Sequence, residues 1–232
     1  MALLLSLETS THAFSCALHQ EGKLMAFRES VVDQTTASML AGMIDELFKD
    51  LGLKKNQLNA VVVAAGPGSY TGLRIGIATA KGICFALNVP LISVNTLSLM
   101  ALQFIDQFEK ILDFKDALLC PMLDARRMEV YCMLADYEGK VTEPIQAKII
   151  EEHSFATLLQ QHTIYFFGEG SDKCKDLIQH ANAKFVSGIR PSASSLGAIG
   201  LQKYAGNEFE NRDVFEPLYL KDFVIRKPNL IS

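Results

Sequence analysis

Apolar residues recur along the chain in two alternating patterns. Three strand-like runs come first, at residues 2–7, 13–19 and 24–29. Apolar residues three and four positions apart then predict a helix over about 35–51, which Asp33 or Thr35 can cap and Gly52 can end. The later elements of this half are predicted at residues 60–65 (strand), about 70–87 (helix), 91–94 (strand) and about 97–108 (helix). The predicted order is βββαβαβα.

The second half follows the same order. Its opening strands are predicted at residues 117–123, 128–135 and 141–150. The remaining elements are predicted at about 154–161 (helix), 163–167 (strand), about 172–181 (helix), 184–186 (strand) and 194–204 (helix). Repetition of one mixed unit indicates an internal duplication: two α/β lobes, each a mixed sheet with helices on its faces, with a cleft between them. We predict an N-terminal lobe at residues 1–108, a C-terminal lobe at 109–191, and residues 192–232 packing back on the first lobe.

Composition and charge narrow the class of protein. The 232 residues are 49% hydrophobic and 21% charged with a net charge of −4, which fits a globular chain and argues against disorder or an independent nucleic-acid-binding module. The five cysteines are odd in number and lack CxxC spacing, so we expect reduced core thiols. The N-terminus lacks the basic segment of a secretory signal, and Asn88, Pro90 and Asn95 interrupt the most apolar stretch. We therefore expect a cytoplasmic protein without a membrane span.

A glycine-rich turn between a strand and a helix is the sharpest local feature. Backbone N–H groups gathered at a helix N-terminus suit an anion or a phosphate, and hydroxyl and guanidinium groups lie close by in the sequence. The candidate anion-binding residues of this turn are Gly66, Gly68, Ser69, Thr71 and Arg74. The segment is no P-loop, because it lacks the lysine, and Thr71 takes the last glycine position of a dinucleotide fingerprint. A tight turn with Ser69 as N-cap and a docking site for a partner remain alternatives.

Small residues on the following helix favour a close helical contact. Gly72, Gly76 and Ala80 are spaced by four residues, and glycine lowers helix stability, so a compensating interaction is expected. The preceding helix has an apolar surface too wide for a single core stripe. We predict an interface between subunits, formed by Met39, Met43, Leu47, Gly72, Leu73, Gly76 and Ala80. The alternative is that both helices pack only on their own sheet.

Two polar hairpins occupy equivalent places in the two halves. Paired acidic hairpin tips facing one cleft could hold phosphates and Mg²⁺ in a duplicated nucleotide-binding fold. The candidate residues are Glu8, Thr9 and Ser10 in the first half and Asp124, Arg126 and Arg127 in the second. Each tip alone is equally well a polar hairpin. No histidine pair has metal-ligand spacing and no nucleophile elbow occurs, so we predict neither a catalytic residue nor a metal site.

Four segments of the chain resemble the bacterial TsaB (YeaZ) family. They are LLSLETST at 4–11, GPGSYTGLRIG at 66–76, DARRMEVY at 124–131 and PLYL at 217–220. The resemblance implies a duplicated actin-like or Hsp70-like ATPase fold of the ribonuclease H-like class. It also implies a non-catalytic relative of TsaD, a protein once regarded as a glycoprotease. The chain departs from the family in having Glu8 where relatives usually carry Asp and no His at positions 34–38.

The same resemblance implies a function in tRNA modification. In this family TsaB joins TsaD and the small ATPase TsaE to place threonylcarbamoyl on the adenosine beside the anticodon, with TsaD holding the metal. TsaB is then a scaffold that docks through the first two helices and forms a homodimer alone. It binds no cofactor tightly, since ATP and Mg²⁺ are used through its partners, and it meets tRNA only in the complex. The alternatives are a free-standing ATPase or kinase of this fold and a glycoprotease-type metallohydrolase, which the histidine spacing opposes.

Overall fold

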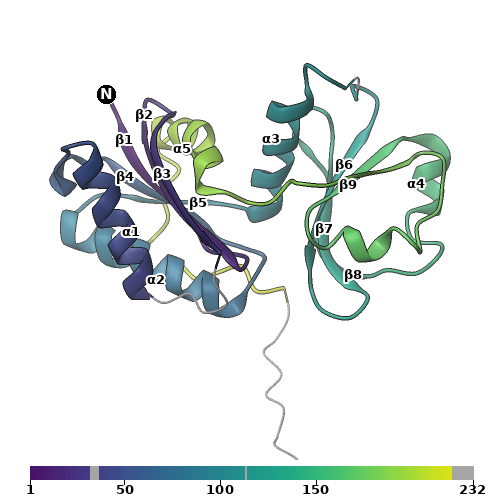
Figure 1. Cartoon of the computed structure of the whole chain (residues 1–232), viewed down its shortest axis with the longest axis horizontal. Coiled ribbons are helices and arrows are strands. Elements are labelled where there is room, and N and C mark those ends of the chain that lie inside the picture. Colours follow the sequence, from purple (N-terminus) through teal and green to yellow (C-terminus); the bar gives the residue numbers. More distant parts are fainter. Residues whose placement is uncertain (32–36, 113, 221–232) are drawn as a thin grey trace, which may run out of the picture.

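Two five-stranded mixed sheets lie side by side in the computed structural model, which describes residues 1–31, 37–112 and 114–220 (Figure 1). The first sheet has the order β3-β2-β1-β4-β5 and the second the order β10-β9-β6-β7-β8. In each sheet the first three strands in sequence are antiparallel and the last two run parallel to the first. Read from β8 to β10, the strand order of the second sheet matches that of the first sheet read from β3 to β5. This match confirms the predicted duplicated α/β fold.

The strands lie close to their predicted positions. Those of the first sheet are β1 (Leu3–Glu8), β2 (Ala13–Gln20), β3 (Lys23–Val31), β4 (Ala60–Ala64) and β5 (Leu91–Val94). Those of the second sheet are β6 (Leu118–Asp124), β7 (Glu129–Ala135), β8 (Val141–Ile149), β9 (Ile164–Phe167) and β10 (Ala183–Val186).

Helices cover both faces of the first sheet because β1 is apolar on both sides. Leu3, Leu5 and Leu7 face α1 (Ala37–Asp50) and α2 (Tyr70–Leu87), whereas Leu4 packs towards α5 (Leu196–Ala205). The short helix η1 (Lys55–Gln57) leads into β4. Asp33 and Thr35, the predicted caps of α1, lie outside the described residues.

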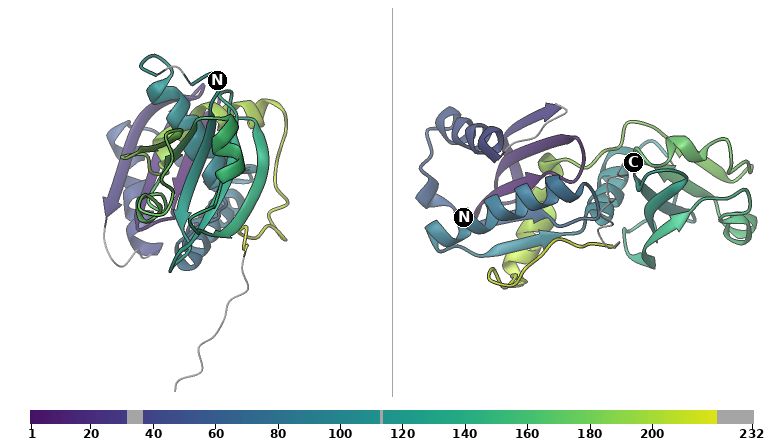
Figure 2. Two further views of the ribbon diagram at one scale, coloured as in Figure 1. Left: turned by 90° about the vertical axis from the view of Figure 1, so that its right-hand side faces the viewer. Right: turned by 90° about the horizontal axis from the view of Figure 1, so that it is seen from below.

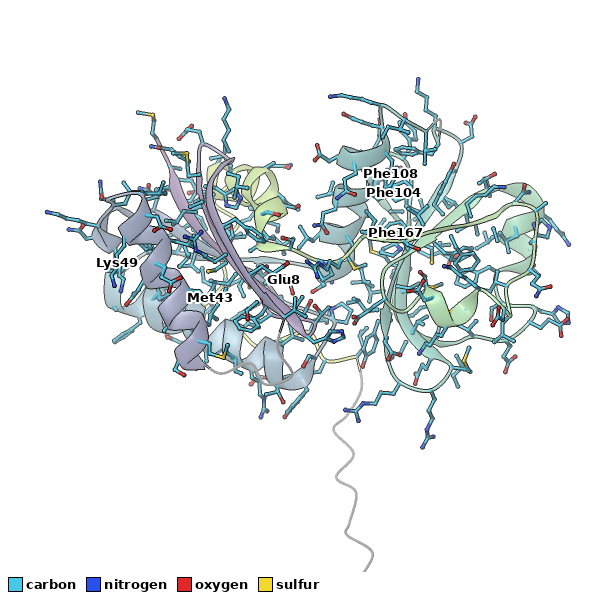
Figure 3. All side chains as sticks on the ribbon, in the orientation of Figure 1. Glu8, Met43, Lys49, Phe104, Phe108 and Phe167 are labelled. Carbon is cyan, nitrogen blue, oxygen red and sulfur yellow. The ribbon has the colours of Figure 1, made fainter. Side chains whose placement is uncertain are left out.

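Helix α3 (Thr96–Phe108) packs on the second sheet and corrects the predicted lobe boundary at residue 108. Asn95 caps its start, because its side-chain oxygen accepts hydrogen bonds from the Leu97 and Ser98 amides. Its buried Phe104 stacks on Phe167 of β9 at 4.7 Å between ring centroids and also contacts Phe108 at 4.9 Å (Figure 3). The last helix of the first half therefore covers the second sheet, while α5, the last helix of the second half, returns to the first.

The returning segment is fixed by hydrogen bonds to the first sheet. The short helix η3 (Ala193–Ser195) carries the Ser194 carbonyl, which accepts from His19 Nε2 at 3.0 Å, while Ser6 Oγ lies 3.0 Å from His19 Nδ1. After α5 the chain runs back along the first lobe (Figure 2), where the Leu218 amide donates to the Ala65 carbonyl at 2.8 Å. Residues 192–220 thus contact the first lobe, and residues 221–232 lie outside the described part.

The second half has less helix than the sequence pattern indicates. Helix α4 spans Ala156–Gln161, but the helix expected at about 172–181 is only the single turn η2 (Asp172–Cys174). Ser171 Oγ donates to the Gly168 carbonyl at 2.7 Å, so this hydroxyl does not cap a longer helix. All five cysteines are buried free thiols. Within the described ranges, no helix is long and apolar enough to cross a membrane.

The packing of α3 predicts a large loss of stability on truncation at its centre. Phe104→Ala removes a fully buried ring that contacts four other aromatic rings, and we expect the free energy of unfolding to fall by about 3–5 kcal/mol. Urea denaturation measures this change. Val214→Ala is the control, because Val214 is 72% exposed and its loss should change stability by about 0.5 kcal/mol or less. Equal effects of the two substitutions would contradict this packing.

Candidate functional site

The glycine turn of the first lobe lies directly on the β1–β2 hairpin. The Ser69 amide donates to the Ser10 carbonyl at 2.6 Å, and a methyl group on Gly68 would overlap that same carbonyl. One turn later, a methyl group on Gly72 would overlap the Thr9 carbonyl, and one on Gly76 would overlap Thr9 Oγ1. Three glycines therefore allow the first two turns of α2 to contact the hairpin backbone closely.

This close contact defines the geometry at the start of α2. Ser69 is the N-cap, with its hydroxyl accepting from the Gly72 amide at 3.3 Å. The Gly66–Pro67 peptide bond is cis, and Gly66 has a φ of 107°. The Ser69 and Gly72 amides therefore already have hydrogen-bond partners within the chain. The tight strand-to-helix turn with Ser69 as N-cap is present, as one of the three interpretations from the sequence expected.

Burial corrects most of the predicted partner surface. Five of its residues lie inside the lobe and have no surface to offer a partner: Leu47, Gly72, Leu73, Gly76 and Ala80. Their small side chains serve contacts within the chain, because α2 packs on β4 and the β1–β2 hairpin. Met39 remains exposed and Met43, which is labelled on α1 in Figure 3, is half-buried.

The second lobe contains a similar contact that sequence reasoning did not single out. In the loop after β9, a Cβ atom on Gly170 would lie 2.6 Å from the Leu123 carbonyl carbon, and one on Gly168 would overlap the Met122 carbonyl. Both lobes therefore pack a glycine loop against the end of their first strand. The repeated Gly-x-Gly spacing at 66–68 and 168–170 is the sequence signal that points to this equivalence.

Glu8 is fully buried at the end of β1 (Figure 3). Its Oε1 accepts a hydrogen bond from the Ser10 amide at 2.5 Å, while Oε2 has no partner among the described residues. Burial raises the pKa of the carboxyl to about 7, and the hydrogen bonds with Ser10 oppose this only in part. Within the same described part, Thr9 Oγ1 and Ser10 Oγ are likewise buried without partners.

The two lobes meet near this hairpin through an ion pair. His12 Nε2 lies 3.7 Å from Glu169 Oε2 in the second glycine loop. Burial raises the pKa of Glu169 and His12 opposes the shift, while the charge of Asp124 adds to it. The structure therefore places the Glu8 hairpin and the Asp124 hairpin in the same region between the lobes. Sequence reasoning missed Glu169, which the glycine spacing alone could have indicated.

Arg74 is held by two aromatic residues, Tyr70 and Tyr219. Its guanidinium lies 4.2 Å from the centre of the Tyr70 ring, and its Nε donates to the Tyr219 hydroxyl at 3.1 Å. The rings of Tyr70 and Tyr219 are 5.0 Å apart. The PLYL segment at 217–220 therefore has a structural role, because its Tyr219 packs on residues at the start of α2. Thr71 is exposed beside it.

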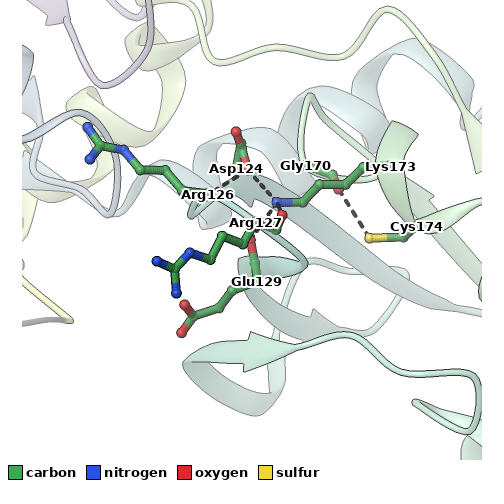
Figure 4. A network of polar contacts seen from close by, with 7 residues as sticks. All are labelled: Asp124, Arg126, Arg127, Glu129, Gly170, Lys173 and Cys174. Carbon is green, nitrogen blue, oxygen red and sulfur yellow. Dashed lines mark hydrogen bonds and ion pairs between the residues drawn. The ribbon is translucent and has the colours of Figure 1, made fainter.

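In the second lobe, Asp124 and the two arginines lie on a tight turn between β6 and β7 (Figure 4). Asp124 Oδ1 accepts from the Arg126 amide at 3.0 Å and pairs with the Lys173 ammonium. Burial alone would raise the pKa of Asp124, but the hydrogen bonds from Lys173 and Arg126 lower it overall. Arg126 and Arg127 are exposed. Across residues 1–31, 37–112 and 114–220, no three or more His, Cys, Asp or Glu side chains are grouped as metal ligands.

Comparison with known proteins assigns the family. The protein named tRNA threonylcarbamoyladenosine biosynthesis protein TsaB from Bacillus subtilis is 26% identical over 212 residues, covering 88% of this chain and 89% of that protein. The Escherichia coli protein of the same name is 28% identical over 235 residues, covering 97% and 96%. A family model described as TsaD, tRNA N6-adenosine threonylcarbamoyltransferase, matches residues 30–228. The chain belongs to this TsaD family, on its TsaB (YeaZ) branch.

Solved structures agree with the TsaB (YeaZ) assignment at the level of the fold. A crystal structure of an uncharacterized Pseudomonas aeruginosa protein with similarity to peptidase YeaZ superposes with a TM-score of 0.82 at 24% identity. The match covers 95% of this chain and all of that one. The duplicated sheets of this TsaB-branch chain thus form the actin-like ATPase fold that the sequence resemblance implied.

The contact between α2 and Thr9 predicts opposite effects for two glycine substitutions on one helix. Gly76→Ala should lower the free energy of unfolding by about 1–3 kcal/mol, because the new methyl group overlaps the Thr9 side chain. Gly82→Ala should raise it by up to about 1 kcal/mol, because nothing lies within 4 Å of the added carbon and alanine favours the helix. Thermal and urea denaturation of both variants test the contact, and stabilisation by both would contradict it.

The buried carboxyl of Glu8 predicts a stability that depends on pH. Folding raises the pKa of Glu8 from 4.5 to about 7, so the protonated carboxyl contributes stability below pH 4.5 that is lost as the pH rises through about 7. The difference corresponds to at most about 3 kcal/mol. Glu8→Gln should therefore match the wild type in acid and be the more stable protein above pH 7. Urea denaturation across this range is the measurement, and parallel curves for the two proteins would contradict the prediction.

Proposed function

We propose that this chain is the non-catalytic scaffold subunit of the assembly that transfers threonylcarbamoyl to the adenosine beside the tRNA anticodon. The names of its relatives, which refer to threonylcarbamoyladenosine biosynthesis, support this assignment. The proposed partners are TsaD, which performs the transfer, and the ATPase TsaE. ATP and Mg²⁺ are used through these partners, and tRNA is bound only by the assembled complex. Without TsaD the chain pairs with a second copy of itself.

The contact of Gly72 and Gly76 with Thr9 is the observation that carries the non-catalytic part of the proposal. A phosphate bound at the glycine turn would have to reach the amides at the start of α2. Two of these amides are already engaged, because the Ser69 amide donates to the Ser10 carbonyl and the Gly72 amide donates to Ser69 Oγ.

Exposed residues on α1 and α2 support docking through these helices. We define the α1–α2 surface by Met39, Gly42 and Met43 on α1 and by Gly82 and Phe85 on α2. A Cβ atom added to either glycine would meet nothing within 4 Å, so a partner helix could approach both helices closely. Phe85 is 79% exposed and Met39 36% exposed, and both offer apolar area to a partner. The small-residue contact predicted from the sequence is thus reassigned to Gly42 and Gly82.

Acidic residues introduced on the α1–α2 surface should separate the chain from its partner. We expect wild-type protein to co-purify with TsaD of the same organism and to exchange its homodimer for a heterodimer. Met39→Glu combined with Phe85→Glu should weaken both pairings by about a hundredfold or more, because two charged groups would be buried in an apolar contact. Size-exclusion chromatography with mass analysis measures the species formed.

A control variant separates this surface from general apolar exposure. Ile149→Glu alters a side chain that is 65% exposed on β8, in the other lobe, and should pair as the wild type does. Absence of wild-type pairing with TsaD at tens of micromolar would contradict the scaffold role. Tight binding of Mg-ATP to the isolated chain, measured by calorimetry, would instead favour the alternative of a free-standing ATPase or kinase.

A further inference from the structure

A polar groove of about 350 Å³ lies at the C-terminal end of α2. Residues 88–90, which follow the helix, line one side of it, and residues 210–213 of the segment that returns after α5 line the other. We call it the α2-end groove. It adjoins the α1–α2 surface, because the exposed Phe85 lies in the last turn of α2, three residues before Asn88. A partner that covers Phe85 would therefore also lie over this groove.

The side of the groove that the returning segment forms is anchored on α2. Arg212 Nη1 donates to the Cys84 carbonyl at 2.8 Å, and Lys81 Nζ donates to the Phe215 carbonyl at 3.2 Å. Phe215 also packs against the core of the first lobe. Contacts on both sides of Asp213 thus hold this residue at a fixed place beside the helix.

The α2-end groove carries a net negative charge. Glu210 and Asp213 bring two carboxylates, and the last turn of α2, which has no basic side chain, adds the partial negative charge of a helix end. Arg212 brings one positive charge. Ser93 donates a hydrogen bond to the Glu210 carboxylate, which fixes that group without neutralising it. Within the described part of the chain, neither carboxylate has a lysine, arginine or histidine nitrogen within 4.0 Å, so a cation from another chain can neutralise the groove.

We propose that the α2-end groove receives a lysine or arginine side chain of TsaD and thereby favours TsaD over a second copy of this chain. The inference rests on the proposed scaffold function, because it concerns the partner that covers the α1–α2 surface. A long cationic side chain can lay its apolar stem beside Phe85 and place its charged end near the two carboxylates. Charge pairs at the edge of an apolar contact contribute mainly to the choice of partner.

A second copy of the chain suits this groove less well than a basic partner does. The cationic side chains that α1 and α2 carry are Lys49, Arg74 and Lys81. Arg74 donates to the Tyr219 hydroxyl and Lys81 to the Phe215 carbonyl, so both are engaged. Lys49 is accompanied on α1 by three carboxylates. A second copy would therefore bring more acidic than basic groups on α1 towards an acidic groove, which disfavours it relative to a cationic partner.

Removal of the two carboxylate charges tests the groove on the full chain. Glu210→Gln combined with Asp213→Asn keeps the size of both side chains and their capacity to accept hydrogen bonds. We expect this double variant to bind TsaD about tenfold more weakly than the wild type does, while the dissociation constant of its homodimer stays within about twofold. Calorimetric titration with TsaD of the same organism gives the first constant, and sedimentation equilibrium of the variant alone gives the second.

Salt dependence and a matched control separate a charge pair from a change of structure or of net charge. The affinity of the wild type for TsaD should fall as the salt concentration rises, and that of the double variant should fall less, because ions screen the charge pair. Glu151→Gln combined with Glu152→Gln removes the same charge from exposed residues of the other lobe and should bind TsaD as the wild type does. Equal weakening by the two double variants would assign the effect to net charge and overturn the proposal.

The outcomes distinguish this inference from the scaffold role. Wild-type protein that does not pair with TsaD would contradict the scaffold role and the groove together. Pairing that the Glu210→Gln, Asp213→Asn variant retains in full, or loses equally for TsaD and for the homodimer, would leave the scaffold role intact and overturn the groove. If that variant does not fold, Asp213→Lys alters one exposed side chain and should leave thermal unfolding within a few degrees of the wild type. Unchanged TsaD binding by Asp213→Lys would likewise overturn the groove.

Discussion

The direct contact between α2 and the β1–β2 hairpin fixes the arrangement of the first lobe. Gly68, Gly72 and Gly76 each meet the hairpin at Thr9 or Ser10 where no side chain would fit. Because β1 lies at the centre of the first sheet, a helix held on the end of that strand is also held in register with the sheet. Glycine weakens a helix, so Gly72 and Gly76 in the first two turns of α2 are retained here for a contact that no other residue permits.

The same contact links the buried end of β1 to the helical surface on the outside. Glu8, at the end of the same strand, is buried, and burial raises the pKa of its carboxyl to about 7. On the far side of α2, Gly82 and Phe85 are exposed to solvent. One face of α2 is thus packed on the hairpin, while residues on its other face are exposed. The two properties have one physical cause, the close packing of α2 on its own hairpin.

The sequence predicted the elements far better than the contacts between them. The spacing of apolar residues and the capping residues located the strands and the bounds of α2, because both signals depend only on neighbouring residues in the sequence. The helix α3 was predicted as a helix, but its apolar side chains do not say which sheet they cover. Small residues at Gly72 and Gly76 indicated a close approach, yet the hairpin that approaches them lies more than sixty residues earlier in the chain. Lys173 gave no signal, since its partner Asp124 is 49 residues away.

Exchange of the last helices explains how two diverged halves remain one assembly. Because α3 covers the second sheet and α5 the first, neither lobe has a complete core without the other half of the chain. The ends of β1 and β6 therefore face each other in a fixed arrangement, and each supports a glycine loop. In the first lobe this loop starts a long helix that packs on the β1–β2 hairpin. In the second lobe the loop leads within three residues to Lys173, whose ammonium contacts the turn that carries Arg126 and Arg127. The same type of loop contact therefore positions different groups in the two lobes.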